Sequence, residues 1–595
     1  MIIAQHISIY AAGMKCFIFF ITCCSLACSG VPVQSPAVSL NQAGYFPGGA
    51  KEAMVMHAAS ENFFLLAENK TDTVLKGLLG AERKSPVSAL SARIADFSAA
   101  RQQGNYWLLV PGSELVPVTV QPDALQEVSA AGLKAYYYQR SDIELVPSFA
   151  GQWARPAGHP DTKVIVHPSA ADAARPAGTI ISSPGGWYDA GDYNKYIVNS
   201  GITMGTLLAA YEDFPGYFDT LKTTIPESGN AVPDILDEVL YNLRWMLTMQ
   251  DPGDGGVYHK CTNAAFDGMV MPGVTKDLRY VVQKSTAATL DFAATAAQAA
   301  RVYKEYEQWL PGLADSCIKA AEKAWKWAKD NSAVLYEQEE MNKKYKPVIS
   351  TGGYGDKQLD DEWFWAAAEL YISTGENEYT DVIKRNAAGV HSLPGWPQVG
   401  MPGIFSLLRH EKRIRAEQIP FPLMKERVIT MADQFVDAMA GSLGHTAMGT
   451  GQRDFIWGSN AVAANQGMLL LNAYTLTKQK KYADAALSNM DYLLGKNATG
   501  YSFVTGIGYK SPLHPHHRPS VADGVVMPVP GLLVGGPNAN AHLQDKCTYI
   551  HKEAERQYTD TLCSYASNEI AINWNAPLVY LAGGLSALAG EAGYR

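Results

Sequence analysis

Two patterns of hydrophobic positions divide the chain near residue 124. Residues 33–123 contain short apolar runs separated by clusters of Gly, Pro, Asn and Ser. This pattern is typical of a small β-sandwich. Over residues 124–595, longer apolar segments with helical spacing replace the short runs. The sequence therefore predicts a multidomain chain, in which an N-terminal β-sandwich precedes one large all-α domain.

The helical pattern is clearest in four segments, 234–250, 285–306, 361–374 and 465–495. These segments are apolar around much of their circumference, so each is expected to pack against neighbours on more than one side. The connecting loops are long and rich in Gly, Pro, His and aromatic residues. Long loops on a rigid helical scaffold favour a binding or catalytic site within them. A closed ring of helices with a cleft at one end fits this pattern.

The first residues have the composition of a targeting segment. Lys15 follows Met14, and an apolar run then extends to Ala27, too short to span a bilayer. We interpret residues 1–28 as a signal peptide whose true start can be Met14. The run before Cys28 also resembles a bacterial lipobox. We therefore expect an exported protein that is secreted, periplasmic or attached to the membrane through a lipidated Cys28.

Composition narrows the class of protein. The chain has 595 residues, of which 47% are hydrophobic and 18% charged, and its net charge is −9 at pH 7. These values indicate a globular protein and give no basic surface for nucleic acid. Outside the leader, Cys547 and Cys563 are candidates for a disulfide after export, and free buried thiols are the alternative. The cysteine spacing matches no zinc motif.

The stretch GGWYDAGDYNKY pairs two acids. Asp189 and Asp192 are three positions apart, with Trp187 before them and Tyr193 and Tyr196 after them. Taken alone, this combination of Asp and Gly is typical of a turn or a helix cap. The functional interpretation is a paired-carboxylate site, in which two carboxylates hold a water and one of them accepts its proton.

A second stretch, residues 501–520, concentrates histidines. His514, His516 and His517 stand close together, and Arg518 follows them. Their spacing on a proline-broken backbone gives no clear helical pair of metal ligands. We interpret the stretch as a loop that offers donors to a polar, hydroxyl-rich or anionic group. A solvated surface turn is the alternative.

A third stretch, YTDTLCSYASNEIAINW, places two acids beside an apolar helix. Asn568 is predicted to cap this helix, which would put Glu569 in its first turn, near Tyr565 and Trp574, with Asp560 just before it. A carboxyl group among aromatic rings tends to have a raised pKa, as a general acid requires. An ordinary first-turn glutamate, favoured by the helix dipole, is the alternative.

Together the three stretches resemble glycoside hydrolase family 9, inverting enzymes that mostly cleave β-1,4-glucans. The first is similar to the family's first acid motif. The second matches the family's histidine signature at Ser502, Val504, Thr505, Gly508, Lys510, Pro515, His516 and Arg518. The third matches its acid signature at Tyr558, Asp560, Tyr565, Glu569, Ala571, Asn575 and Ala576. Residues 33–123 resemble the immunoglobulin-like module that precedes many family 9 catalytic domains.

The resemblance implies an (alpha/alpha)6 toroid for residues 124–595 and a role for each acid. Asp192 is the expected general base that activates water, Asp189 is expected to help hold that water, and Glu569 is the expected general acid. Inversion requires the acid and the base on opposite faces of the sugar, about 6.5–9.5 Å apart. The aromatic residues of the first stretch would then hold the sugar.

Further residues are expected around the substrate. Those expected to contact the sugar are His516, Arg518, His259, Tyr565 and Trp574. Asp560 is expected to support the loop of the acid. Trp574 stands where many relatives have Tyr, so its local network is expected to differ.

The resemblance implies no cofactor for the chemistry but does suggest a structural metal. Asp361 and Glu362 stand where family members often bind calcium, and hard oxygen ligands suit that ion. A helix N-terminus with favourable acids is the alternative. Zinc is not expected, because the segment 136–167 carries His159 and His167 without a cysteine.

The sequence therefore predicts an endo-acting β-1,4-glucanase with a β-glucan polysaccharide or oligosaccharide as substrate. One alternative is another activity on the same fold, either an exo-acting glucosidase or glucosaminidase, or a hydrolase of mixed-linkage glucan or xyloglucan. A second alternative is a non-catalytic, glycan-binding surface protein. The intact pair Asp192 and Glu569 favours an enzyme.

Overall fold

The computed structural model describes residues 37–414, 417 and 419–595. The predicted signal peptide, including Met14 and Cys28, lies outside these residues. Within them, no helix combines the length and the apolar character needed to cross a membrane.

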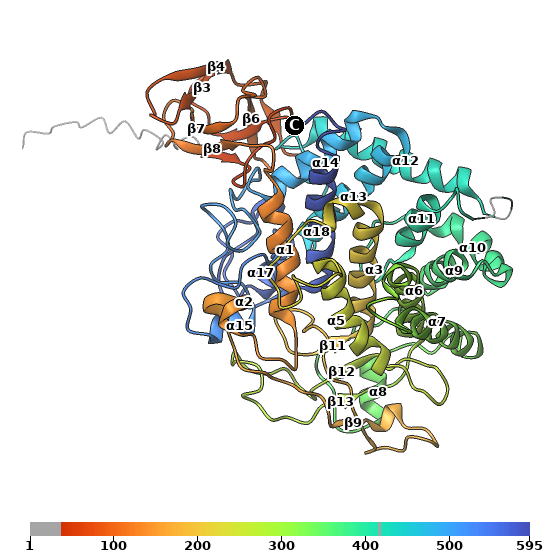
Figure 1. Cartoon of the computed structure of the whole chain (residues 1–595). Helices are drawn as coiled ribbons and strands as arrows, with labels where there is room; N and C mark the ends of the chain where they lie inside the picture. Colours follow the sequence, from red (N-terminus) through yellow and green to blue (C-terminus); the bar gives the residue numbers. More distant parts are fainter. Residues whose placement is uncertain (1–36, 415–416, 418) are drawn as a thin grey trace, which may run out of the picture.

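Two four-stranded antiparallel sheets form the N-terminal domain (Figure 1), with strand orders β1-β2-β6-β5 and β4-β3-β7-β8. Alternation along the strands turns Phe63 and Leu65 of β3 and Leu108 of β7 into the core between the sheets. The predicted sandwich is therefore confirmed. Its strands are β1 (Ala37–Leu40), β2 (Glu52–Met56), β3 (Asn62–Ala67), β4 (Thr73–Leu78), β5 (Arg83–Lys84), β6 (Ser91–Asp96), β7 (Gly104–Leu109) and β8 (Val116–Val120).

A closed ring of helices forms the second domain (Figure 1). Contacts run in order through α3, α6, α9, α11, α12, α13 and α18 and return to α3, while α1, α5, α7 and α14 pack on α18, α3, α6 and α13. The main helices are α1 (Gln126–Gln139), α3 (Ile197–Asp213), α5 (Asp234–Thr248), α6 (Thr286–Tyr303), α7 (Leu313–Asp330), α9 (Asp360–Thr374), α11 (Gly400–Arg409), α12 (Phe421–Ala438), α13 (Ser459–Thr477), α14 (Lys480–Leu493) and α18 (Ile572–Leu588). Shorter helices are α2 (Pro147–Ala150), α4 (Pro215–Phe218), α8 (Gln338–Lys344), α10 (Thr380–Asn386), α15 (Arg518–Ala522), α16 (Ala541–Gln544) and α17 (Tyr565–Asn568).

The inner helices are buried almost all round, as their sequences predict. In α6, Arg301 is the single residue that is not buried. Small alanine side chains allow this close packing on several sides. The segment 465–495, in contrast, is divided into α13 and α14, because Lys478 adopts a left-handed conformation with φ of 57° that ends the first helix.

A third, small sheet lies inside the helical domain and is not predicted from the sequence. Its order is β10-β9-β13-β12-β11. Its strands are β9 (Val164–Val166), β10 (Ile180–Ile181), β11 (Lys195–Tyr196), β12 (Lys260–Thr262) and β13 (Tyr280–Val281). Strands this short carry no visible alternation. The sheet nevertheless anchors the first acid stretch, because β11 is the end of that stretch and pairs with β12.

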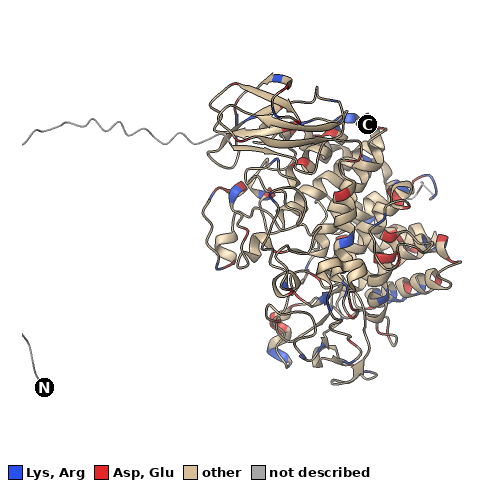
Figure 2. Cartoon of the chain, turned by 60° about the vertical axis from the view of Figure 1, so that its left-hand side comes forward, with Lys and Arg blue, Asp and Glu red and all other residues tan. Residues whose placement is uncertain are grey.

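The two domains are joined by buried polar contacts. Glu52 of β2 accepts from Lys496 Nζ at 2.9 Å and contacts His445 Nδ1 at 2.9 Å. Asn41 Nδ2 donates to Asp491 Oδ1 at 2.8 Å. Burial disfavours the charged form of Glu52, but Lys496 and His445 outweigh it and hold the pKa of Glu52 at about 2. Positions of basic and acidic residues are interspersed along the described chain (Figure 2).

Replacing Lys496 by Met should destabilise the protein, because Glu52 would remain largely buried without its cation. We expect a loss of about 3 kcal/mol in the free energy of unfolding, measured by denaturant titration. Lys480→Met is the matched control, since Lys480 forms an exposed pair with Asp484 and its loss should cost less than about 1 kcal/mol. Equal losses for the two variants would contradict this account of the interface.

Candidate active site

Asp192 occupies the bend before β11 and is 5% exposed. Its Oδ2 accepts from Asn194 Nδ2 at 2.5 Å and from the Tyr196 hydroxyl at 3.1 Å. Asn194 is fixed in turn by Arg279, whose Nη1 donates to Asn194 Oδ1 at 3.3 Å. Both donors to the carboxylate use Oδ2, which leaves Oδ1, among the described contacts, as the oxygen that can take a proton from water.

Asp189 is buried beside Asp192 and is bonded at both oxygens. Asn199 Nδ2 donates to Oδ1 at 2.5 Å, and the Tyr354 hydroxyl donates to Oδ2 at 2.7 Å. Burial raises the pKa of Asp189 to about 8, and the charge of Asp192 adds to this rise. Burial also raises the pKa of Asp192, but Asn194, the charge of Arg518 and Tyr196 oppose it. Asp192 is therefore the member of the pair that ionises first.

The position of Glu569 differs from the predicted one. Glu569 is extended, with φ of −71° and ψ of 159°, between α17 and α18, and it is not in the first turn of a helix. Asn568 does not cap α18, because its Nδ2 donates instead to Asp560 Oδ1 at 3.0 Å and to the His514 carbonyl at 2.8 Å. Ala571 precedes the first residue of α18. Glu569 is instead held as a strand-like residue in a bridge with His516.

Gly191 joins the three stretches of the candidate site. Its carbonyl accepts from Arg518 Nη1 at 2.5 Å, and its N–H bonds to the carboxylate of Glu569. A Cβ atom at this position would collide with the carbonyl oxygen of His516. Next to it, Ile572 N donates to the Asp189 carbonyl at 2.9 Å. The glycine is therefore required for the base and acid segments to meet.

Glu569 has the electrostatics of a general acid. Burial raises its pKa to about 8, the charges of Asp192 and Asp189 add to the rise, and the charge of Arg518 opposes it. The side chain keeps part of its surface exposed. At neutral pH the carboxyl therefore carries the proton that a leaving group needs.

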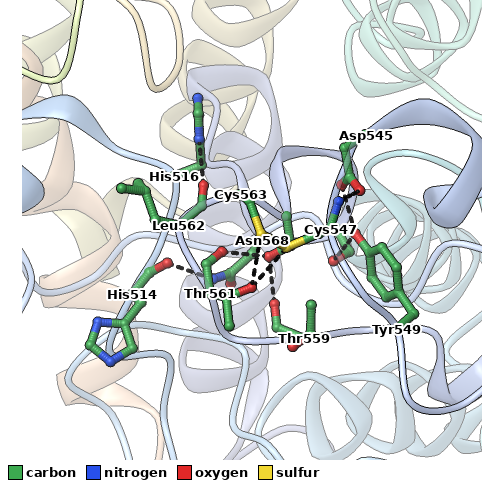
Figure 3. Close-up of a disulfide and its surroundings, with 12 residues drawn as sticks. His514, His516, Asp545, Cys547, Tyr549, Thr559, Thr561, Leu562, Cys563 and Asn568 are labelled. Atoms are coloured by element: carbon green, nitrogen blue, oxygen red, sulfur yellow. Dashed lines mark hydrogen bonds between the residues drawn. A yellow bond between two sulfur atoms is a disulfide. The ribbon is translucent and has the colours of Figure 1, made fainter. Parts of the chain in front are cut away.

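Asp560 and His516 contact the chain segment that carries Glu569. Asp560 Oδ1 accepts from the backbone N–H of His514 at 2.8 Å and also from the side chain of Asn568, so it ties the histidine stretch to the residue before Glu569. The role of Asp560 as a support of the loop of Glu569 stays a prediction. Burial lowers the pKa of His516, and its Nδ1 bonds to the Leu562 carbonyl at 2.9 Å (Figure 3). The neutral ring therefore donates through Nδ1 and keeps Nε2 as an acceptor.

The aromatic residues of the first stretch do not face a sugar. Trp187, Tyr188, Tyr193 and Tyr196 are each at most 1% exposed. These side chains pack against neighbouring residues and form hydrogen bonds, such as the one that the Tyr196 hydroxyl donates to Asp192. The expectation that they hold the sugar is therefore wrong: these rings form the support of the aspartates.

Other aromatic rings near the site are open to solvent. Trp457 is 38% exposed and lies against Tyr565, with ring centroids 5.7 Å apart. Phe266 is 49% exposed and lies 5.7 Å from the guanidinium of Arg518. Trp457 and Phe266 were missed by sequence reasoning, because they stand outside the three stretches and carry no spacing signal. Trp574, a predicted contact, packs against Gly458.

Two predicted sugar contacts are buried in the structure. Arg518 is 6% exposed and also donates from Nε to the Asp267 carbonyl at 3.0 Å. His259 is fully buried, and its ring nitrogens bond to Ser285 Oγ at 2.9 Å and to the Gly353 carbonyl at 2.8 Å. Burial lowers the pKa of His259 to about 3. The predicted sugar contact of His259 gains no support from this placement.

The predicted calcium residues lie at the start of α9. Asp361 Oδ2 accepts from the Val399 N–H at 2.7 Å. Glu362 is fully buried, as is Asp291 of α6, and the carboxylate oxygens of both have no hydrogen-bond partner. Over the described ranges, no group of three or more His, Cys, Asp or Glu side chains is placed to hold a metal ion. Asp291 was missed because it sits inside an alanine-rich helix.

Buried carboxyl groups from distant stretches, brought together on a ring of helices, are the arrangement expected of an enzyme that hydrolyses glycosidic bonds. Comparison with known proteins gives the family. Residues 126–582 match the model of glycosyl hydrolase family 9, and residues 33–114 match that of the cellulase N-terminal ig-like domain. The chain belongs to glycosyl hydrolase family 9.

Relatives resemble the chain over nearly its whole length. A xyloglucan-specific endo-beta-1,4-glucanase from Bacteroides ovatus is 45% identical, covering 95% of this chain and 96% of the relative. Endoglucanase D from Acetivibrio thermocellus is 32% identical, covering 94% of this chain and 83% of the relative. Among solved structures, a Bacteroides ovatus GH9 protein has a TM-score of 0.89 at 45% identity, with 93% of this chain and 99% of that chain covered. A thermostable endoglucanase from Alicyclobacillus acidocaldarius has a TM-score of 0.81 at 32% identity, with 92% and 99% covered.

The alkaline limb of the pH profile should report the ionisation of Glu569. A general acid is active while protonated, so kcat/KM should stay high through neutral pH and fall as the pH rises past about 8. Glu569→Gln should abolish hydrolysis of a glucan while leaving the circular dichroism spectrum unchanged. An alkaline limb near about pH 4.3, the ordinary pKa of a glutamate, would contradict the assignment.

Proposed function

We propose that the chain is an inverting endo-β-1,4-glucanase that cleaves xyloglucan, a β-1,4-glucan with branched side chains. The catalytic mechanism in this proposal rests on the contacts of Gly191, through which the segment of the proposed base Asp192 meets the proposed acid Glu569. The substrate class is supported by the 45% identity, over almost the full length of both chains, to a relative described as xyloglucan-specific.

In the proposed mechanism, Asp192 accepts a proton from a water through Oδ1, and Asp189 helps orient that water. The water attacks the anomeric carbon while Glu569 donates its proton to the leaving oxygen, so both atoms and charge balance in one displacement. Neutral His516 accepts a hydrogen bond from a sugar hydroxyl through Nε2. The buried side chain of Arg518 stabilises the negative charge of Asp192.

Trp457 and Tyr565 supply an aromatic face next to the acid. Flat aromatic side chains combine large apolar area with a defined orientation, which suits the apolar face of a pyranose ring. We assign this pair to the side of the leaving sugar, because Tyr565 also lies 5.7 Å from the ring of His516. The alternative of a non-catalytic glycan-binding protein is disfavoured by the buried, pKa-shifted carboxylates.

Export is part of the proposal. The signal peptide of residues 1–28 directs the chain across the membrane, and lipidation of Cys28 would hold it at the surface of a bacterial cell. Mass spectrometry of the N-terminal peptide distinguishes a lipidated Cys28 from a free N-terminus.

The proposed function is tested on a panel of xyloglucan, mixed-linkage glucan and cellohexaose. We expect the fastest hydrolysis on xyloglucan, a spread of oligomers early in the reaction, and α-anomeric products by NMR. Asp192→Ala should abolish turnover, whereas Asp72→Ala, an exposed acid of the sandwich, should leave it unchanged. Early β-anomer would contradict inversion, and release of a single short product from the start would contradict endo action.

We further propose that Asp291 and Glu362 hold a structural Ca²⁺. Their oxygens are buried and unpartnered, which fits a hard cation whose other ligands are carbonyl oxygens or water. Without a cation, burial raises the pKa of both carboxyls, and the charges of nearby acids, Asp361 among them, add to the rise. The ion would link α6 to α9 in the ring and would take no part in the chemistry.

Calcium should raise the stability of chelator-treated protein. At a hundredfold excess over its Kd, a ligand that binds the folded state adds about 2.7 kcal/mol to the free energy of unfolding. We expect a calcium-dependent rise in the melting temperature by calorimetry, and its loss in Asp291→Asn. An unchanged melting temperature, with no heat of binding by titration calorimetry, would contradict the metal site.

A further inference from the structure

A disulfide joins Cys547 to Cys563, and Figure 3 shows it among the residues that surround His516 and Asn568. Of the two alternatives that the sequence left open, this pair forms the disulfide, while Cys261 and Cys317 are free and buried. The bond closes a loop with a sequence separation of 16. Its second cysteine lies six positions before Glu569, and its neighbours contact the site on two sides.

One side of the disulfide fixes His516. Cys563 directly follows Leu562, whose carbonyl accepts from His516 Nδ1 at 2.9 Å. The next residue, Ser564, donates its hydroxyl to the carbonyls of Thr559 and Thr561 at 2.6 Å each. The Leu562 carbonyl, which is adjacent to the disulfide, therefore orients the imidazole of His516.

The other side fixes the short helix α17 that leads to Glu569. Asp545 accepts from the Cys547 N–H through Oδ1 at 3.0 Å. Through Oδ2 it accepts from the Tyr549 hydroxyl at 2.7 Å and from the Ala566 N–H at 3.1 Å (Figure 3). Ala566 lies inside α17, whose last residue precedes Glu569.

The loop is exposed close to the disulfide, although Ala554 and Tyr558 in its middle belong to the hydrophobic core and α17 is largely buried. Ile550 is 87% exposed and Leu562 is 37% exposed. Other exposed residues in the loop are Lys546, Thr548, Lys552, Thr561 and Cys563. Segments with few buried apolar contacts open locally at low free-energy cost. A covalent bond removes the open conformations that hydrogen bonds alone would permit.

We propose that the Cys547–Cys563 disulfide is a positioning element of the active site, which holds Glu569 in the geometry needed to protonate the leaving group and fixes the ring of His516 beside it. The proposal rests on the proposed role of Glu569 as general acid. Without the bond, both side chains would sample other positions, and small displacements of catalytic groups cost rate rather than affinity. Leaving groups that need little protonation should be less affected.

The experiment compares three forms of the full-length mature protein: oxidised wild type, wild type treated with dithiothreitol, and Cys547→Ser/Cys563→Ser. Dithiothreitol reduces the S–S bond to two thiols and is itself oxidised to its cyclic disulfide. Each form is assayed on a xyloglucan oligosaccharide and on the nitrophenyl glycoside of the same oligosaccharide, whose phenol leaves with little acid assistance. Cys317→Ser, in α7, is the matched control.

We expect kcat on the oligosaccharide to fall about tenfold in the double-serine variant and in the reduced wild type, with KM and far-UV circular dichroism nearly unchanged. The decrease in kcat on the nitrophenyl glycoside should be far smaller. The double-serine variant should not respond to dithiothreitol, and Cys317→Ser should behave as wild type.

Two results would overturn the proposal while leaving the proposed function intact. One is an unchanged kcat on the oligosaccharide without the disulfide. The other is an equal loss on both substrates, which would indicate a general loss of folded enzyme. If the oxidised wild type hydrolysed neither substrate, the proposed function itself would fall, and the positioning role with it.

Discussion

The close approach of the chain at Gly191 is the constraint on which the active site depends. The carbonyl of this residue accepts from Arg518, its N–H bonds to Glu569, and His516 leaves no room for a side chain. A bridge between Ala190 and Ala571 continues the contact. The base and the acid therefore lie on backbone segments that bond to one another directly, and their relative position does not rely on flexible side chains. Such rigidity is what preorganised catalysis requires.

The charges of the site follow from that proximity. Burial raises the pKa values of Asp189, Asp192 and Glu569, and the charges of neighbouring carboxyl groups raise those of Asp189 and Glu569 further. Donors and cations oppose this rise most at Asp192, where Asn194, Tyr196, Arg518 and Arg279 all act, while Arg518 also opposes it at Glu569. The same environment thus separates the acids into one that ionises readily and one that keeps its proton, which is the division of roles that acid and base catalysis needs.

The sequence was sufficient for the architecture and for the three stretches, because both depend on local signals. Helical spacing predicted α5, α6 and α9 almost to their bounds, and turn-separated runs predicted the sandwich. The small sheet behind Asp192 was not predictable, since strands of two or three residues have no period. The prediction for Glu569 was wrong for a specific reason. Asn568 stands before an apolar helix, where an asparagine commonly caps the helix, but its side chain bonds instead to Asp560 and to the His514 carbonyl.

The missed aromatics have a different cause. Sequence proximity to the aspartates suggested that Trp187 and Tyr196 meet the sugar, yet rings next to a buried carboxylate are the ones most needed to bury it. Tyr196 donates to Asp192, and Trp187 Nε1 donates to Glu238 at 3.3 Å. Exposed rings such as Trp457 come from loops outside the three stretches that carry the acids and histidines. Proximity along the chain thus identified the rings that bury the aspartates. The exposed aromatic rings near the site could be identified only from the fold.

The sandwich takes part in the same arrangement. Gln42 Oε1 accepts from the Lys510 N–H at 2.9 Å, at the start of the segment that leads to His516. Ser88 donates its hydroxyl to Glu555 at 2.5 Å, in the segment that leads to Asp560. The N-terminal domain therefore touches both chain segments that converge on the acid. These contacts and the Cys547–Cys563 disulfide therefore act on the same chain segments, which lead to His516 and Glu569. The role that best fits the sandwich is a buttress of the catalytic loops.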